Sequence, residues 1–234
     1  MRRFYLLLGF VLLTTCLQAQ SFEQLRDSLR RATNEMEYHP DSADLRLKKA
    51  GINLLLEQWQ LAKDEYDYVL RLDPKNPAAL YFRAYANEKL RRYHFARLDY
   101  EALLQLVPGN FEAQLGLALL NQKDMHYTEA YNQLNLLAEI HPDSAVVFAA
   151  RAGLESERKM LELAEYDYSK ALTLQPDQCD WLLARANLRL QLKRKADAEE
   201  DLDRLVALGV PRSTLEEYYQ KLGKGKKKNR KRAR

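Results

Sequence analysis

Histidine, cysteine and paired carboxylates are the side chains that most often hold metals or transfer protons. In this sequence the histidines and cysteines are few and far apart. Its four histidines are His39, His94, His126 and His141, and two of them directly precede a proline. No two are spaced as metal ligands. The chain also lacks a glycine-rich phosphate loop, a Gly-x-Ser-x-Gly motif and a nucleophile with an evident base. We therefore expect a non-catalytic protein with no cofactor and no metal site.

The charged residues do show a pattern, because a basic residue is followed by an acidic one sixteen residues later. The four pairs are Lys49 with Glu65, Arg83 with Asp99, Arg151 with Asp167, and Arg185 with Asp201. Where Leu117 replaces the basic residue, Gln133 replaces the acidic one, so both charges are lost together. This covariation within one chain predicts structural ion pairs. A row of arginines for an anionic ligand is the alternative, which the built-in acidic partners disfavour.

A repeat of 34 residues underlies this pattern, with windows at 43–76, 77–110, 111–144, 145–178 and 179–212. Alanine occupies the eighth and the twentieth position of every window: Ala50, Ala84, Ala118, Ala152 and Ala186, then Ala62, Ala96, Ala130, Ala164 and Ala198. A fixed period of this length is typical of stacked two-helix units. Small residues at fixed positions predict close helix crossings, because larger side chains would separate the backbones.

Each window has the start and stop signals of two helices. Ser42, Asn76, Asn110 and Ser144 precede four of the first helices and can accept hydrogen bonds from free backbone amides there. Position 32 is proline in four windows, and the fifth has Pro211 one position later. Proline cannot continue a helix, so these residues predict the end of each second helix.

The pattern resembles the tetratricopeptide repeat (TPR) family over residues 43–212. The matches are the small residues at positions 8 and 20, the proline at 32, and an aromatic residue at 24 as Tyr66, Tyr100 and Tyr168. Position 11 departs, with Asn53, Asn87, Asn121, Glu155 and Arg189 where the family has tyrosine, and position 27 is mostly larger than alanine. The resemblance implies an all-α, right-handed superhelical solenoid of helix-turn-helix repeats. It also implies a protein-interaction scaffold.

In this family, positions 2, 5, 9, 12 and 13 of the first helices line a concave groove that binds peptide segments. The resemblance places these residues in such a groove here: Leu47, Gly51, Tyr81, Tyr85, Lys89, Leu115, Leu119, Gln122, Gly153 and Asn187. Some relatives bind a C-terminal carboxylate with Lys and Asn at positions 5 and 9 of the first repeat. Leu47 and Gly51 stand there, so that activity is not expected. The set suits an apolar or helical segment of a protein partner. For Leu54 and Leu55, packing on neighbouring helices is an equal alternative.

The first 19 residues are typical of a secretory signal, with Arg2 and Arg3 before an apolar run at 4–13. That run is shorter than the roughly 20 residues that span a membrane. The alternative to cleavage near Ala19 is lipidation of Cys16. Without the signal only Cys179 remains, and no Asn-x-Ser/Thr sequon occurs. We therefore expect export, to a bacterial periplasm.

The ends of the repeat array have their own signals. Residues 20–42 match the second half of a repeat and predict a capping helix, while Ser213 to Glu216 resemble a capping box that opens a second capping helix over 213–222. Residues 223–234 carry eight basic residues, and we expect them to be disordered.

The basic residues of the chain are concentrated in that tail. Without them and without Arg2 and Arg3, 27 basic residues face 33 acidic ones. A tail of this charge can be attracted to an anionic membrane surface. The alternative function is therefore an envelope-assembly or membrane-associated component acting through the tail. Export makes nucleic acid an unexpected partner.

Overall fold

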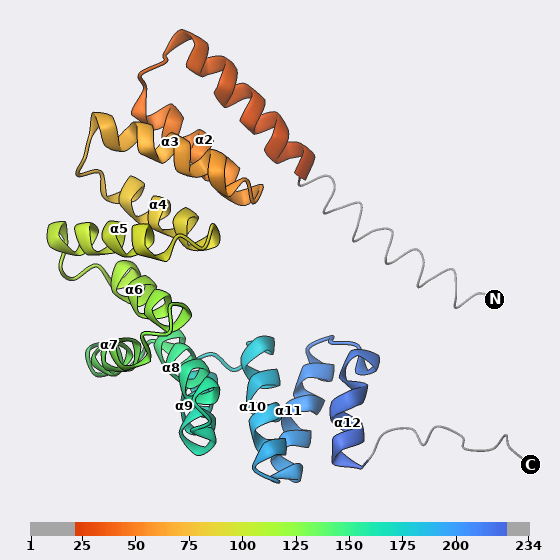
Figure 1. The fold of residues 1–234 in the computed structure, drawn as a ribbon. Helices are drawn as coiled ribbons and strands as arrows, with labels where there is room; N and C mark the ends of the chain where they lie inside the picture. Colours follow the sequence, from red (N-terminus) through yellow and green to blue (C-terminus); the bar gives the residue numbers. More distant parts are fainter. Residues whose placement is uncertain (1–21, 224–234) are drawn as a thin grey trace, which may run out of the picture. The chain divides into compact units, whose positions relative to one another are not determined.

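The computed structural model describes residues 22–223, which form helices joined by short turns (Figure 1). The described residues contain no strand, and the predicted all-α class is confirmed. The predicted signal at 1–19, the lipidation site Cys16 and tail residues 224–234 lie outside the described residues. The chain divides into two compact units after Leu120, within helix α6.

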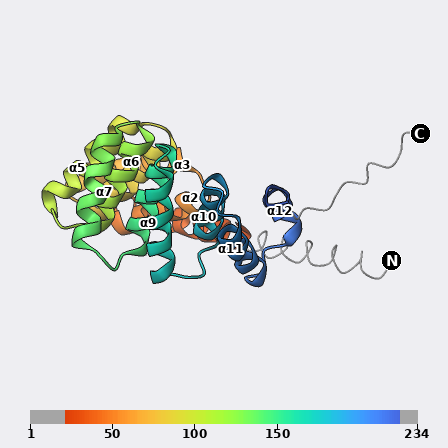
Figure 2. The same cartoon turned by 90° about the horizontal axis from the view of Figure 1, so that it is seen from below.

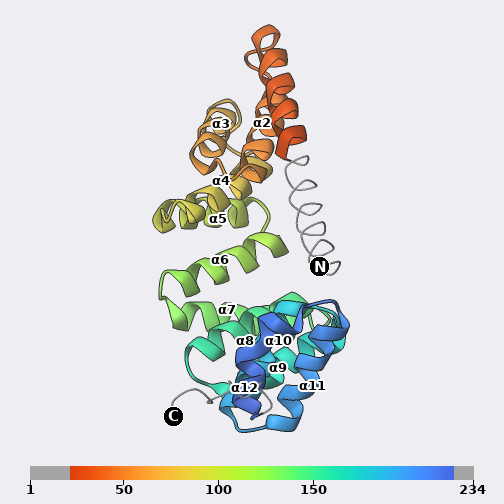
Figure 3. The same ribbon diagram turned by 90° about the vertical axis from the view of Figure 1, so that its right-hand side faces the viewer.

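The first compact unit begins with a helix over residues 22–38, the segment predicted to cap the array. The helices that follow are α2 (Ala43–Leu55), α3 (Trp59–Leu72), α4 (Pro77–Lys89), α5 (Tyr93–Leu106) and the first part of α6 (Phe111–Lys123). Helix α3 packs on both α2 and α4, and α4 packs on α5 (Figure 3). Consecutive helices from α2 to α5 are therefore in contact, as in a stacked array.

The second compact unit continues the same order. Its helices are α7 (Tyr127–Ile140), α8 (Ala145–Glu157), α9 (Leu161–Leu174), α10 (Cys179–Gln191), α11 (Lys195–Ala207), the 3-10 helix η1 (Arg212–Leu215) and α12 (Glu216–Leu222). Helix α9 packs on α8 and α10, and α12 packs on both α10 and α11 (Figure 2). Helix α12 thus covers the last repeat.

The predicted caps open three of the first helices. Ser42 accepts a hydrogen bond from the amide of Leu45 at 3.3 Å, Asn76 from Ala79 at 3.0 Å, and Asn110 from Ala113 at 2.7 Å. The fourth predicted cap, Ser144, makes no such side-chain hydrogen bond. The caps satisfy amides that have no partner within their own helix.

The alanines at positions 8 and 20 lie in the interior of the fold, and all ten are completely buried. In the first compact unit Ala50, Ala62, Ala84 and Ala96 share a core with Tyr66 and Tyr100, the aromatic residues of position 24. The uniform burial of both columns agrees with the close helix packing that the sequence predicts.

The turn inside every repeat contains a strained residue that the sequence does not reveal. Position 15 is left-handed in all five repeats, with φ between 56° and 64°, at Glu57, Arg91, Met125, Lys159 and Lys193. In each case the next amide bonds the carbonyl of position 11, and the strained residue's own amide bonds that of position 12. This is the Schellman arrangement, in which glycine is the usual left-handed residue.

The C-terminal cap differs from the prediction. Residues Arg212–Leu215 form a 3-10 helix, and α12 begins only at Glu216. The N-caps of these two helices are Pro211 and Leu215, and neither makes a side-chain cap hydrogen bond, while the Thr214 hydroxyl donates to the carbonyl of Pro211 at 2.7 Å. Leu215, Tyr219 and Leu222 are nevertheless buried against the fifth repeat, so the segment covers the end of the core as expected.

Candidate functional site

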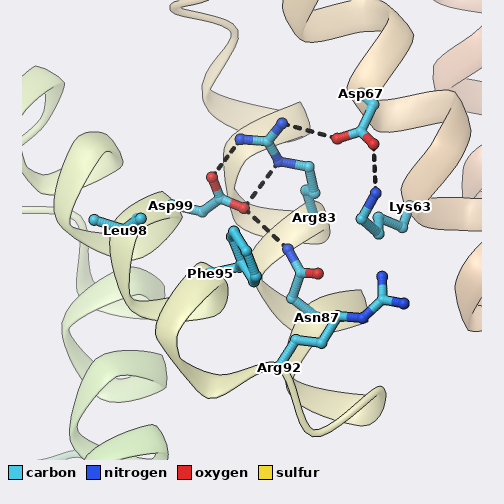
Figure 4. Close-up of a pocket in the computed structure, with 8 residues that line it drawn as sticks. All are labelled: Lys63, Asp67, Arg83, Asn87, Arg92, Phe95, Leu98 and Asp99. Atoms are coloured by element: carbon cyan, nitrogen blue, oxygen red, sulfur yellow. Dashed lines mark hydrogen bonds and ion pairs between the residues drawn. The ribbon is translucent and has the colours of Figure 1, made fainter.

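Arg83 of α4 lies between two second helices. Its Nε and Nη2 donate to the two carboxylate oxygens of Asp99 in α5 at 2.9 and 2.5 Å. Its Nη1 donates to Asp67 of α3 at 2.9 Å (Figure 4). Burial raises the pKa of Asp67, but hydrogen bonds from Lys63 and Arg83 outweigh it and hold the pKa below its usual value. One guanidinium therefore ties its own repeat to the preceding one.

The sixteen-residue pairs predicted from the sequence are present in all four repeats that carry them. The other three are Lys49 with Glu65 at 2.7 Å, Arg151 with Asp167 at 2.5 Å, and Arg185 with Asp201 at 2.6 Å. The acidic partners Asp99, Asp167 and Asp201 are buried. Each arginine is thus neutralised within its own repeat, which leaves it unsuited to hold an external anion.

The second contact of these arginines was not predicted. Arg151 also donates to Asn135 at 3.0 Å, and Arg185 to Ser169 at 3.1 Å. These acceptors lie sixteen residues before the arginine, as Asp67 does for Arg83. Aspartate, asparagine and serine share only a hydrogen-bond acceptor. The shared role of these three positions is therefore found in the sequence only when residues are compared by hydrogen-bonding capacity instead of charge.

The polar residues at position 11, where the chain departs from the family, also have a structural role. Asn87 donates to Asp99 at 3.4 Å, Asn121 to Gln133 at 2.8 Å, and Arg189 to Asp201 at 3.0 Å. Each donor thus supports the acceptor twelve residues later.

The fourth repeat has an acid, Glu155, at this position. Burial, with the nearby charge of Asp167, raises the Glu155 pKa to about 7 against the opposing effects of Arg151 and of a hydrogen bond from Tyr131. The fourth repeat therefore has a second acid beside Asp167, at the position where the second, third and fifth repeats have a hydrogen-bond donor.

Three of the predicted groove residues come together between α2 and α4. Gly51, Tyr81 and Tyr85 line a cavity of about 600 Å³. The rest of its lining is Lys48, Ile52, Leu54, Leu55 and Phe82. We call these eight residues the α2–α4 surface. Leu55 remains 64% exposed, whereas Leu47 and Leu54 are partly buried against the core.

The aromatic side chains of this surface are held by ring contacts. Tyr85 meets Trp59 edge to face, with centroids 6.0 Å apart, and the Lys89 ammonium lies 5.1 Å from the Tyr85 centroid. Such contacts fix ring orientation. Trp59 is absent from the predicted set because it begins a second helix, whereas the prediction considered only first helices.

Tyr81 is more than a surface residue. Its ring contacts Phe82 at 5.2 Å and the buried Tyr100 at 5.9 Å, and burial raises its pKa. Tyr81 therefore packs against the core as well as lining the α2–α4 surface. Tyr85 is the better probe of this surface, because its ring contacts Trp59, which is partly buried, and Lys89, which is exposed.

The other predicted groove residues are not part of this cavity. Leu115 and Leu119 are half-buried on α6. Gln122 donates to Glu157 at 2.9 Å, Gly153 faces the Tyr168 hydroxyl, and Asn187 is exposed on α10. These last three belong to the second compact unit.

A second cavity, of about 460 Å³, lies between α3, α4 and α5 (Figure 4). We call it the α3–α5 pocket, and its lining is Lys63, Asp67, Arg83, Asn87, Arg92, Phe95, Leu98 and Asp99. The sequence does not predict this pocket, because among its lining residues only the ion-pair positions recur in the other repeats.

Over residues 22–223, no three His, Cys, Asp or Glu side chains are grouped so that they could hold a metal ion. In the same part of the chain, every helix is too short or too polar to cross a membrane.

Comparison with solved structures identifies the fold. A tetratricopeptide repeat protein from Parabacteroides merdae superposes with a TM-score of 0.72 at 21% identity, covering 87% of this chain and 80% of that one. Pseudomonas aeruginosa PilF gives 0.67 at 19% identity, covering 78% and 85%. YrrB, described as a TPR protein with an unusual peptide-binding site, gives 0.53 at 17% identity, covering 76% and 92%. No protein-family model and no curated protein matches the sequence. The chain therefore has the tetratricopeptide repeat fold.

Proposed function

We propose that this chain is a non-catalytic protein-interaction scaffold whose α2–α4 surface binds an apolar or helical segment of a partner protein. The observation that carries the proposal is the cavity of about 600 Å³ between α2 and α4, whose lining is mainly aliphatic and aromatic. Binding energy in protein interfaces is concentrated where aromatic and aliphatic side chains form such concave, desolvated sites.

The surface has room for an inserted side chain. Apart from its two chain neighbours and the backbone of its own helix, nothing lies within 4 Å of the position that a Gly51 Cβ would take. Trp59 and Lys89 hold Tyr85 at the edge of this space. A wall that is ordered before binding loses less side-chain entropy when a ligand arrives, so this geometry favours a defined segment over nonspecific adhesion.

The comparison with YrrB supports a peptide as the class of ligand, since that protein is described as having a peptide-binding site. At 17% identity the likeness extends to the fold alone. The residues that support peptide binding in this chain are those of its own α2–α4 surface.

Selection from a displayed peptide library tests the proposal. We expect enriched peptides to carry apolar residues at helical spacing, and Tyr85→Ala to weaken their binding at least tenfold, about 1.4 kcal/mol. Gly51→Leu should also weaken it, by filling the cavity. The matched control is Leu163→Ser, which removes an exposed leucine from α9 and should leave binding unchanged.

Two results would count against this function. One is a set of enriched peptides that bind wild type and Tyr85→Ala equally when both proteins show the same circular dichroism. The other is binding that disappears on deletion of residues 223–234 and survives Gly51→Leu, which would favour the tail as the site. Vesicles of anionic lipid distinguish a membrane role of the tail from binding to protein.

We also propose that the protein is exported, because Arg2 and Arg3 precede an apolar run at 4–13. N-terminal sequencing of the mature protein tests this. A new terminus near Gln20 supports cleavage after Ala19, and a lipid-modified Cys16 supports anchoring. An intact Met1 contradicts both.

A further inference from the structure

The α3–α5 pocket lies on the opposite side of α4 from the α2–α4 surface. Successive residues of an α-helix are about 100° apart around its axis. Arg83 and Asn87 therefore lie about 200° from Tyr81 and Tyr85. The two cavities have no lining residue in common, so the α3–α5 pocket can be occupied independently of the proposed function.

Most charges in this pocket are already paired. Lys63 and Arg83 contact Asp67, and Arg83 also contacts Asp99. Arg92 is the exception. Its guanidinium has no ion-pair or hydrogen-bond partner within residues 22–223, and Figure 4 shows no interaction between it and the other labelled side chains. The pocket therefore has one cation whose charge no nearby carboxylate neutralises.

The base of the pocket contains an unused acceptor. Asn87 is 2% exposed, and its Nδ2 donates to Asp99 at 3.4 Å. Its Oδ1 is buried and accepts no hydrogen bond. A buried acceptor without a donor destabilises the folded chain, so a ligand that brings an N–H group to this oxygen removes that cost.

The fifth repeat shows what occupies the equivalent place. There Lys63, Asn87 and Arg92 correspond to Glu165, Arg189 and Arg194, at the same spacings of 24 and 29 residues. Glu165 accepts from Arg189 Nε at 2.9 Å and from Arg194 Nη1 at 2.7 Å. In the fifth repeat the chain thus supplies its own carboxylate to the arginine that corresponds to Arg92. Beside the second repeat the equivalent residue is Lys63, which has no carboxylate to offer Arg92.

The side chains on the walls of the two pockets also differ, and they are apolar in the second repeat and acidic in the fifth. Phe95 and Leu98 are 58% and 48% exposed, and their counterparts in the fifth repeat are Asp197 and Glu200. The pocket of the second repeat therefore combines an unpaired cation, a buried acceptor and two exposed apolar side chains, whereas that of the fifth repeat is internally paired and polar.

We propose that the α3–α5 pocket binds a peptide segment of a partner protein in which an acidic residue adjoins an apolar one. The carboxylate pairs with Arg92, as Glu165 pairs with Arg194. A backbone N–H of the segment donates to Asn87 Oδ1, and the apolar side chain packs on Phe95 and Leu98. Arginine suits this role because its planar group can bind a carboxylate through two hydrogen bonds.

An NMR titration of the full chain with the blocked peptide acetyl-Leu-Glu-Leu-Ala-amide tests the proposal. We expect saturable shifts of the Phe95 and Leu98 amides. The matched peptide with Gln in place of Glu should bind at least tenfold more weakly. Arg92→Gln should cause a similar loss, and so should Lys63→Glu, because it supplies an internal carboxylate to Arg92. Arg194→Gln is the control and should leave the affinity unchanged.

Equal affinity for the Glu and Gln peptides would overturn the proposal, and so would unchanged binding to a folded Arg92→Gln variant. Shifts centred on Gly51 and Tyr85 would place the peptide on the α2–α4 surface instead. If sodium acetate binds as tightly as the peptide, the pocket is a simple anion site and its assignment to a peptide is wrong.

Discussion

Gly116 of α6 lies directly against the ring of Tyr100 in α5. A Cβ atom built on Gly116 would lie 2.8 Å from Cζ and 2.9 Å from Cε1 of that ring, closer than real contacts allow. Tyr100 is buried and also meets the ring of Tyr81, so it has little room to shift. Tyr100 of the second repeat therefore requires a glycine at position 116, in the first helix of the third repeat.

This contact predicts opposite effects of alanine at two helical glycines. Gly116→Ala gains helix propensity but overpacks the core, a change that costs about 1–3 kcal/mol, so we expect net destabilisation of about 1 kcal/mol. Gly51→Ala meets nothing within 4 Å and should stabilise by about 0.5–1 kcal/mol. Urea unfolding measures both changes. A similar free-energy change for the two variants would show that the Tyr100 ring moves aside freely.

The ion pairs predict strong coupling within a repeat. In a double-mutant cycle of Arg83→Ala and Asp99→Ala, we expect a coupling free energy of about 1 kcal/mol or more, because Asp99 is buried and accepts two hydrogen bonds from Arg83. The matched control is Arg204 with Asp177, whose side chains are 50% and 60% exposed. Its coupling should be about 0–0.5 kcal/mol. Additive effects for Arg83 and Asp99 would contradict the structural role of this pair.

The sequence predicted the parts of the fold that depend on residue size and charge. Ala50 and Ala84 are small and completely buried, and Arg83 and Asp99 have opposite charges and form an ion pair. Such constraints restrict the residue type in every repeat, so comparing repeats within one chain reveals them.

Other features restrict the residue type less and were not predicted. The left-handed turn residue is not glycine in any repeat. The backbone hydrogen bonds of the turn hold this conformation with several residue types, so the residue type does not reveal it. The α3–α5 pocket depends on Lys63 and Arg92, which differ from their counterparts Glu165 and Arg194. A site that is formed where the repeats differ cannot be found by a search for what the repeats share.

The left-handed turns can be relieved by glycine. Lys159 has a φ of 64° and is exposed, and a non-glycine residue in this region costs about 1–2 kcal/mol. Glycine loses more backbone entropy on folding, so we expect Lys159→Gly to stabilise by about 0.5–1 kcal/mol in thermal or urea unfolding. Lys159→Ala is the control and should have little effect. Stabilisation by alanine as large as that by glycine would point to the lysine charge as the cause.

Glu155 predicts a dependence of stability on pH. Its pKa in the folded chain is about 7, raised from an ordinary value of 4.5 by burial and by Asp167. Because the folded state holds the proton more tightly, the stabilisation that this proton provides is complete below about pH 4.5. It is lost as the pH rises through 7. Above that pH a buried carboxylate faces Asp167, and one of its oxygens has no hydrogen-bond donor.

Glu155→Asn removes this charge and offers the donor that Asn121 provides to Gln133 in the third repeat. We expect the variant to be more stable than wild type by about 1–3 kcal/mol at pH 8.5. Its advantage should shrink at pH 5, where wild-type Glu155 is largely protonated. Urea unfolding across this range measures the difference, with Glu162→Gln on the exposed side of α9 as the control. A constant difference between pH 5 and 8.5 would show that Glu155 does not titrate there, and a less stable variant at pH 8.5 would show that Arg151 depends on both acids.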